Sequence, residues 1–561
     1  MTRHVVWQAG LAVLGIGLVF VILFRTTSDV KPIEAPAPGG IYREGVLGYY
    51  SAINPILASR AIGVNPVDQD LSDLVFNGLT SLDASGQVTP TLATDWDVSE
   101  DGTVYEFRLR RGVTWQDGAP FTAADVVFTI QAIQDPDFQG DPGLHNLWRS
   151  VGVEQVDNLT VRLILQERFP SFIYYTTIGL LPAHLLGDVP AADLPASDFS
   201  TRQPVGTGMF MIETLSSNGA VLVTNPSFWG RKPFMERLEF RFFGDEDGLL
   251  ASYERGEIDG FHPSRIQSVA NLARFPGLQL FSAEYAGYGI VFLNLRRDTC
   301  AFFQVVEVRQ ALLYGLDRQA VIDQVLGGQA LVADSPIVPM LWAYDPAVRR
   351  YAYDPQRAIG LLDASGWVDS DGDRIRDKGE VALAFELLTS DDLTTVQMAQ
   401  EMAAQWRALG ADVTVRPVAA NMVPGLLQIR DFDAVLTELG VTADPDPYPL
   451  WHSTQAGESG QNFSGFSSEA ADVAMEKMRS AADPKQRAPL YDAFQQIFTE
   501  QVPSLLLYYP VYTYAVDERV REVQLSPLLR PSDRFRNIQD WYVETAKIVI
   551  NDQEQLDNPE K

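Results

Sequence analysis

A strand–helix–strand pattern constrains the fold more than any other feature of this sequence. The segment Val381–Leu388 (VALAFELL) is typical of a buried strand. A helix is expected to begin at Asp391-Asp392, and Gly410 stands where a helix C-cap is expected. The next strand is Ala411–Val418 (ADVTVRPV). Because parallel strands need a crossover connection, this β-α-β unit predicts a partly parallel sheet in an α/β fold.

Other segments predict further strands and helices. Val104–Arg110 alternates as a strand does, and Ala434–Leu439 is a further strand. Phe121–Ile133 opens with a threonine cap before a helix, and Val308–Leu326 is expected to form a single long amphipathic helix. With 561 residues, the chain is too long for one core, so two or more lobes are expected.

The N-terminus carries a long apolar run. Val5–Phe24 holds twenty residues without a charge, which is enough to cross a bilayer as a helix. A cleaved signal peptide is the alternative, although the run is long for one and Pro38 directly follows the small-x-small site Ala35-Pro36-Ala37. We therefore favour an uncleaved anchor within residues 1–25.

Two polar segments flank the expected globular part. Residues 26–40 form a Pro/Gly-rich tether, and residues 551–561 form a polar tail. The globular part is expected to begin near Ile41.

Charge and motif content exclude several classes of function. The formal net charge of −30 repels nucleic acid. Cys300 is the only cysteine, so the chain has no intrachain disulfide and no thiolate metal cluster. The sequence contains no G-x-S-x-G elbow, no phosphate-binding loop and no zinc spacing among its histidines. An enzyme is therefore not expected, although a hydrolase with a pair of carboxylates stays open as an alternative.

An acidic loop at residues 369–380 (DSDGDRIRDKGE) has the spacing of a calcium loop. Its acids occupy positions 1, 3, 5, 9 and 12 and are Asp369, Asp371, Asp373, Asp377 and Glu380. Position 6, normally glycine, is Arg374. Two interpretations stay open: a structural calcium site, or a solvated turn whose aspartates cap backbone N–H groups, which we favour.

Several stretches, taken in order, resemble the extracytoplasmic solute-binding proteins of peptide-type ABC importers, bacterial solute-binding protein family 5. The resemblance runs from about residue 41 to residue 545. The stretches are FNGL (76–79), PTLATDWDVSEDGTVYEFRLRRGVTWQDGAPFTAADVVFT (90–129), PVGTGMF (204–210), NPSFWGRKP (225–233), YERGEIDG (253–260), FLNLRR (292–297), VRQALLYGLDRQAVI (308–322), YDPQRAIGLLDASGW (353–367) and DPDPYPLWHS (444–453).

This resemblance implies an α/β, two-lobe periplasmic-binding-protein-like fold that closes by hinge bending. Lobe I would span residues 41–283 plus 507–550, with an extra subdomain inserted at about 65–195. Lobe II would span residues 284–506. The ligand would lie in the cleft between the lobes.

The resemblance also implies a set of ligand-binding residues. In peptide-binding members, an aspartate shortly before the D-P-D stretch pairs with the α-amino group of the ligand. The corresponding segment here, Leu439–Thr442, has no acid and no tryptophan, so either Asp444 or Asp446 is expected to substitute or to cap the turn. The expected ligand-binding residues are Tyr50, Tyr285, Tyr288, Asp444, Asp446, Trp451, His452 and Tyr512.

The implied function is capture of an oligopeptide and its delivery to the permease subunits of an ABC importer. The protein is expected to be a monomer on the extracytoplasmic face of the cell membrane, held by its N-terminal helix, without a cofactor other than the calcium considered above. The first alternative is the same fold binding an oligosaccharide or another small solute. A sensor domain or an acidic hydrolase is a weaker alternative.

Overall fold

The computed structural model describes residues 32–58, 65–263, 274–457, 460–481 and 484–549, together with the single residues Trp7, Ile16, Val269 and Leu272. Apart from two of these single residues, the predicted anchor lies outside the described part of the chain, as does the polar tail. Within the described part, no helix has the length and apolar character needed to cross a bilayer.

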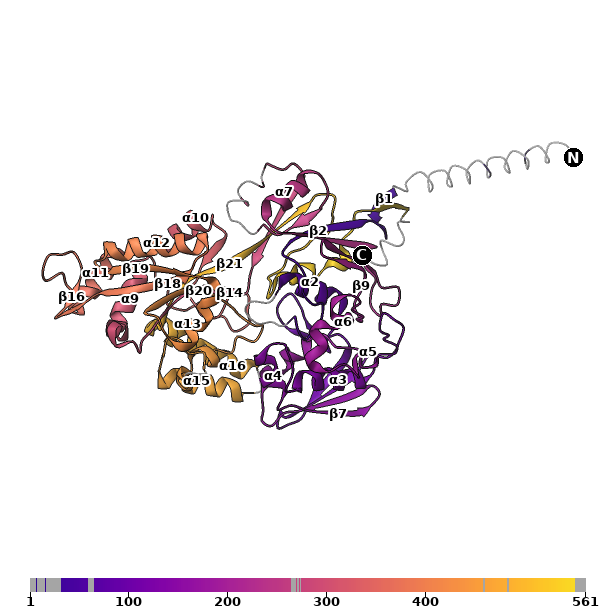
Figure 1. The fold of residues 1–561 in the computed structure, drawn as a ribbon, viewed down its shortest axis with the longest axis horizontal. Helices are drawn as coiled ribbons and strands as arrows, with labels where there is room; N and C mark the ends of the chain where they lie inside the picture. Colours follow the sequence, from indigo (N-terminus) through magenta and orange to yellow (C-terminus); the bar gives the residue numbers. More distant parts are fainter. Residues whose placement is uncertain are drawn as a thin grey trace.

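Most of the strands belong to one twelve-stranded sheet that runs through two lobes (Figure 1). The strand order is β19-β18-β20-β14-β21-β12-β2-β11-β10-β9, and β13 and β15 also pair with β21. The bounds are β2 Ile41–Leu47, β9 Phe210–Ser216, β10 Gly219–Thr224, β11 Arg237–Phe243, β12 Gly260–Phe261, β13 Leu278–Glu284, β14 Gly287–Leu293, β15 Ala330–Val332, β18 Ala384–Ser390, β19 Asp412–Val418, β20 Ala434–Gly440 and β21 Ser504–Asp517.

Strand β21 joins the two lobes. Up to Pro510 it pairs with β14 and β15 of lobe II, and from Val511 onward it pairs with β13 and β12 of lobe I. The other crossing is the short connection from β13 to β14, where the Tyr285 N–H donates to the Pro510 carbonyl (3.0 Å). The change of partner at Pro510–Val511 lies slightly beyond residue 507. The predicted domain bounds stay a prediction.

The β-α-β unit of lobe II is confirmed, but its first strand, predicted from Val381, begins at Ala384; Val381 pairs with Lys378 in a separate two-stranded sheet. Strands β18 and β19 are parallel, and α12 (Leu393–Ala408) connects them. The Asp392 carboxylate accepts the N–H of Thr395 (2.9 Å) and caps the start of α12. Gly410 follows the helix with a φ of +91°, a left-handed backbone that favours glycine.

The single helix predicted over residues 308–326 is wrong. The structure has two helices there, α9 (Val306–Tyr314) and α10 (Arg318–Val325). Gly315, a poor helix former, follows α9, and the Asp317 carboxylate accepts the Ala320 N–H (3.0 Å) to cap α10. Gly315, which ends α9, and the Asp317 cap, which starts α10, therefore divide a segment whose apolar pattern alone predicts one continuous helix.

The inserted subdomain contains a separate four-stranded sheet of order β5-β6-β8-β7. The predicted strand and the threonine-capped helix are confirmed here as β6 and α3. The elements of this region, with α2 before it and α6 after it, are α2 Pro66–Val75, β3 Thr80–Leu82, β4 Val88–Pro90, β5 Ala93–Val98, β6 Val104–Leu109, α3 Ala123–Gln134, α4 Pro142–Trp148, β7 Gly152–Asp157, β8 Thr160–Ile164, η1 Pro170–Thr177, α5 Ala183–Leu186, η2 Ala191–Ala196 and α6 Asp198–Thr201.

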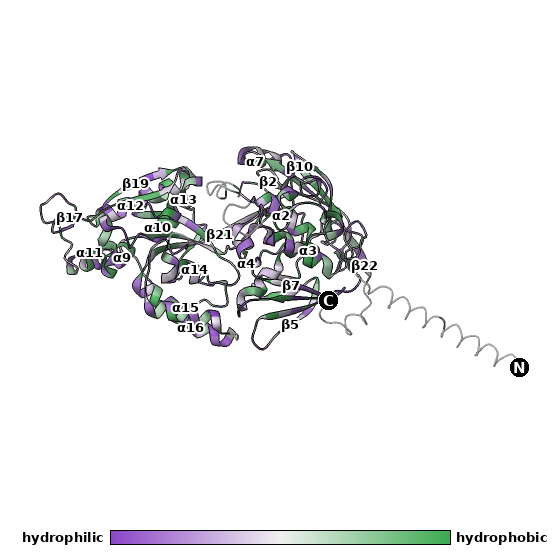
Figure 2. Ribbon diagram, turned by 60° about the horizontal axis from the view of Figure 1, so that its bottom comes forward, coloured by the Kyte–Doolittle hydropathy of each residue, from purple (hydrophilic) through white to green (hydrophobic). Residues whose placement is uncertain are grey.

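The remaining helices cover the sheet or follow its strands. Those at the surface of lobe II, such as α15 and α16, carry hydrophobic and hydrophilic residues along one helix, as amphipathic helices do (Figure 2). The remaining elements are α7 Glu246–Glu254, η3 Asp298–Gln304, α11 Pro355–Ala364, β16 Asp377–Lys378, β17 Val381–Ala382, η4 Ala420–Met422, α13 Val423–Ile429, α14 Tyr448–Trp451, η5 Ser453–Ala456, α15 Glu469–Ser480, α16 Pro484–Gln501, η6 Pro531–Phe535 and η7 Ile538–Asp540.

Part of the predicted tether forms a strand. β1 (Pro32–Pro36) pairs antiparallel with β22 (Thr545–Val549) near the C-terminus. Two prolines stand at the ends of β1, where a missing N–H interrupts the strand pairing least. Regular structure is therefore already present before Ile41, where the globular part was expected to begin.

A buried ion-pair network attaches the C-terminal segment to lobe I. Arg534 of η6 contacts Glu44 of β2 (2.9 Å) and Asp70 of α2 (2.5 Å), and all three side chains are at most 3% exposed. The Glu44 carboxylate also accepts the hydroxyl of Tyr514 on β21 (2.7 Å). Because charges are costly to bury unpaired, this network holds four separate segments together.

Replacing this arginine is expected to destabilise lobe I strongly. Arg534→Met leaves two buried carboxylates unpaired, which costs about 3–5 kcal/mol. Urea unfolding followed by tryptophan fluorescence measures the loss. Arg202→Met is the control, because the Arg202–Asp198 pair is exposed (75% and 81%) and should contribute nothing measurable. Equal unfolding midpoints for the two variants would contradict the role assigned to Arg534.

Candidate ligand-binding cleft

A cavity of about 1050 Å³ lies between the two lobes. Lobe I lines it with residues of α2, α4, η1 and the η6–η7 segment, and lobe II lines it with the 336–341 loop and with residues 440–451. Residues 440–447 directly follow the carboxyl end of β20, the place where open α/β sheets bind their ligands. The volume is at the upper end of the range for ligand pockets.

Apolar side chains from both lobes dominate the wall of this cavity. They bury apolar parts of a ligand without requiring one fixed geometry. The main ones are Leu74, Phe76, Leu144, Leu147, Phe169, Tyr175, Ile178 and Phe535 from lobe I, and Tyr288, Ile337, Val338, Leu341, Val441, Leu450 and Trp451 from lobe II.

Asp444 lines the cavity but is engaged in a buried ion pair. Its carboxylate contacts the Arg487 guanidinium (3.1 Å) and accepts the hydroxyl of Tyr491 (3.1 Å). The two charged side chains are 5% and 6% exposed. The Arg487 guanidinium also lies over the ring of Trp342 (5.4 Å). Asp444 therefore belongs to a packed network within lobe II.

Asp446 also lines the cavity and is also paired. It accepts two hydrogen bonds from Arg479, at 2.8 and 2.6 Å, and one from the Tyr448 N–H (3.1 Å). Arg479 lies over the ring of Tyr448 (3.9 Å), which stacks on His452 (4.0 Å, 19°). His452 was predicted to contact the ligand. It lies behind this stack, is 2% exposed and does not line the cavity.

Two aromatic residues expected at the cleft lie at its wall, mostly within the core of lobe II. Trp451 is 1% exposed and packs edge-on against Phe498 (4.7 Å). Tyr288 of β14 is also 1% exposed, and burial raises the pKa of its hydroxyl. Ligand contact by these residues, and by Asp444 and Asp446, stays a prediction.

The other three tyrosines do not line the cavity. Tyr50 packs against Phe242 of lobe I (6.1 Å), and its hydroxyl contacts the Thr201 carbonyl. Tyr285 is at the crossing between lobes, packed against the lobe I core. Tyr512 points into lobe I, where it stacks on His262 (4.2 Å, 10°). Successive side chains of β21 point to opposite faces of the sheet. A position near the crossing between the lobes therefore does not by itself expose Tyr512 to the cleft.

Sequence reasoning missed the charged wall that lobe I contributes. Arg530 contacts Asp73 of α2 (3.3 Å) and Asp533 (3.4 Å), and Asp533 also pairs with Arg536 (3.1 Å). The Ser532 hydroxyl donates to Asp73 (2.6 Å). The only sequence pattern that could have predicted this charged wall is the alternation of basic and acidic residues in RPSDRFR (530–536), and this segment is not part of any motif quoted above.

The lobes meet at one edge of the cavity. Tyr174 of η1 lines the cavity, and α15 of lobe II contacts η1. Burial raises the pKa of Tyr174 and nearby Asp444 raises it further, whereas Arg487 and a hydrogen bond with Trp342 lower it. The phenol of Tyr174 therefore contacts Trp342 of lobe II and lies near the Asp444–Arg487 pair.

The acidic loop lies away from the cleft, at the far end of lobe II, and forms capped turns. Asp369 accepts the N–H groups of Gly372 (2.7 Å) and Arg374 (3.1 Å), and Asp371 accepts that of Asp373 (3.1 Å). Arg374 has a φ of +74°, so the position normally held by glycine does need a left-handed backbone.

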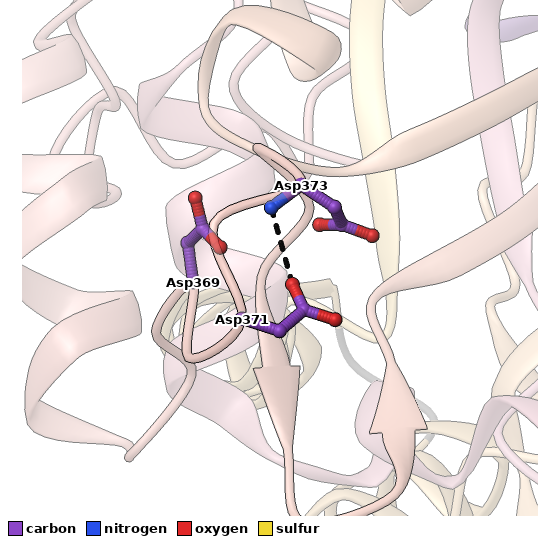
Figure 3. Close-up of side chains that lie close together, drawn as sticks. All are labelled: Asp369, Asp371 and Asp373. Atoms are coloured by element: carbon purple, nitrogen blue, oxygen red, sulfur yellow. Dashed lines mark hydrogen bonds between the residues drawn. The ribbon is translucent and has the colours of Figure 1, made fainter.

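Three acids of this loop are close enough to share a cation. Oxygens of Asp369, Asp371 and Asp373 lie within 4.8 Å of one another, and all three residues are exposed (Figure 3). Asp377 and Glu380 are not part of this group; Asp377 instead accepts the hydroxyl of Ser370 (2.6 Å). The hydrogen bonds fit the capped turn, and the calcium site stays a prediction.

Two α/β lobes on a shared sheet, with a ligand-sized cavity between them, define the class of two-lobed solute-binding proteins. Residues 87–461 match the family described as "Bacterial extracellular solute-binding proteins, family 5 Middle". The chain belongs to this family, which confirms the resemblance seen in its motifs.

Relatives of known ligand cover nearly the whole chain. The oligopeptide-binding protein AppA of Bacillus subtilis is 27% identical over 92% of this chain and 94% of its own. The structure of that protein with a nonapeptide aligns with a TM-score of 0.71 at 25% identity, covering 91% of this chain and all of the other. NikZ of Campylobacter jejuni in complex with Ni(L-His) aligns with a TM-score of 0.72 at 26% identity, covering 90% of this chain and 99% of the other.

Removing the Tyr174 hydroxyl is expected to loosen the edge where the lobes meet. A lost hydrogen bond is worth about 0.5–1.5 kcal/mol, so Tyr174→Phe should speed amide hydrogen exchange in η1 by up to about tenfold. The matched control is Tyr353→Phe, which alters an exposed tyrosine (49%). Unchanged exchange in η1 would mean that the hydroxyl does not hold this contact.

The two interpretations of the acidic loop predict different responses to calcium. A calcium site predicts that about 1 mM Ca²⁺ raises the melting temperature relative to chelator, and that Asp369→Asn with Asp373→Asn abolishes the rise. A capped turn predicts equal melting temperatures in both conditions, which is the result we expect. A calcium-dependent rise that the double substitution removes would overturn this expectation.

Proposed function

We propose that this chain captures a peptide in the cleft between its lobes and delivers it to the permease of an ABC importer. The observation that carries the proposal is the cavity of about 1050 Å³, bounded by both lobes and by the end of β20. Support comes from the similarity of the whole chain to an oligopeptide-binding protein whose structure holds a nonapeptide.

Closure follows from the connection between the lobes. β21 and the β13–β14 connection are the two crossings within the described chain, so a small backbone rotation there changes the opening of the cleft. A ligand that contacts both walls binds the closed form better and shifts the population toward it. The closed form is then the state presented to the permease.

The proposal places a monomeric receptor on the outer face of the cell membrane. The apolar run Val5–Phe24 would anchor it, and β1, paired with β22, follows that run in the sequence. The ligand is bound and released without a chemical step, so the protein is not an enzyme.

A non-peptide solute is the alternative. NikZ, with a similar fold, was solved with Ni(L-His), and the heme-binding protein A of Haemophilus influenzae is 26% identical over 85% of this chain. The apolar and aromatic wall also suits an oligosaccharide.

Native mass spectrometry of the full chain, purified without refolding, tests the proposal. We expect a series of bound masses that release as mixed peptides, because a cavity with many apolar side chains, whose aspartates are already engaged within the protein, accepts many sequences. Recovery of a sugar, or of a metal chelate as the sole ligand, would contradict peptide capture. A chain without ligand that also fails to bind peptides added afterwards would contradict it equally.

A further inference from the structure

The aspartates that line the cavity are already engaged. Asp444 pairs with Arg487 and Asp446 with Arg479 in lobe II, while in lobe I Asp73 and Asp533 both pair with Arg530. The fifth, Asp141, accepts the Gly143 N–H (2.8 Å) at the start of α4. No glutamate lines the cavity within the described part of the chain.

The partner of Asp446 is held firmly. Arg479 makes two hydrogen bonds to one carboxylate oxygen and lies over Tyr448, so its guanidinium is fixed by charge and by stacking. The Asp446 side chain is 17% exposed. At the cavity wall, the Asp446 carboxylate is therefore already paired with the Arg479 guanidinium.

At four of the five aspartates that line the cavity, an incoming α-ammonium group would have to compete with an arginine, and the fifth, Asp141, already caps the N-terminus of α4. Displacing an arginine gains one ion pair and loses another, and it leaves a partly buried guanidinium without its carboxylate. Charge recognition of the ligand N-terminus therefore contributes little net affinity, and the apolar walls and backbone groups of both lobes must supply the rest.

We propose that this cleft binds peptides without an ion pair to their α-amino group, so that N-terminally blocked peptides are as good ligands as free ones. The inference rests on the proposed function and names its substrate class: peptides selected by apolar side chains and main chain, whatever the state of their N-terminus.

A capture experiment tests this directly. The full chain is offered an equimolar mixture of two synthetic libraries of lysine-free octapeptides, identical except that one is N-acetylated, and the captured peptides are quantified by mass spectrometry. We expect the ratio of acetylated to free peptides to stay within about threefold of the input. Enrichment of the free form by tenfold or more, equivalent to about 1.4 kcal/mol, would overturn the proposal.

A variant tests the part assigned to Arg479. Arg479→Met releases Asp446 and should shift capture several-fold toward free amines, whereas Arg350→Met, which removes a 64% exposed arginine of the same lobe, should not. If Arg479→Met still captures acetylated and free peptides equally, Arg479 is not the residue that prevents Asp446 from binding the α-amino group. Capture of neither library would overturn the proposed function itself, and the inference with it.

Discussion

The structure depends on one strand that belongs to both lobes. β21 runs for fourteen residues and changes partners near its middle, from β14 and β15 to β13 and β12. Its side chains enter the hydrophobic cores of both lobes. The sheet is therefore continuous, yet the covalent connection between lobes is confined to this strand and the short β13–β14 connection, which is the arrangement that permits rotation without unfolding.

Charge pairing is the second constraint. The chain carries 73 acidic and 43 basic residues, a formal net charge of −30, so acidic side chains outnumber their possible partners and the placement of each arginine matters. Arg534 holds the C-terminal segment on lobe I, Arg487 and Arg479 neutralise the aspartates of lobe II at the cleft, and Arg530 does so on the opposite wall. The result is a strongly acidic surface around a cavity whose described acids are already engaged, and this leaves shape and apolar contact as the main terms in ligand binding.

Local patterns predicted the elements well and the cleft only in part. The β18-α12-β19 unit was readable because strand and helix periods differ and Asp392 and Gly410 mark the helix ends. The motif resemblance placed Asp444 and Asp446 at the cavity. Their arginine partners lie 43 and 33 residues further along the chain, a separation that no local pattern reveals.

The same limitation explains the misplaced aromatic residues. Tyr512 and Tyr50 were expected at the cleft by analogy, yet the register of β21 and the ring of His262 set the direction of Tyr512, and packing against Phe242 sets that of Tyr50. The pairing of β1 with β22 also joins segments that are more than five hundred residues apart. The composition of residues 26–40, which contain β1, predicted only a tether.

Closure of the lobes on a peptide is the central claim, and the distance across the cleft tests it most directly. Spin labels at Asn146→Cys on α4 and Lys477→Cys on α15 would lie on exposed positions of opposite walls, and Cys300 is buried (1% exposed) and should not react. Pulsed electron spin resonance is expected to show a broad, longer distance distribution without ligand and a narrow, shorter one with bound peptide. An identical distribution in both states, with binding verified, would contradict the account.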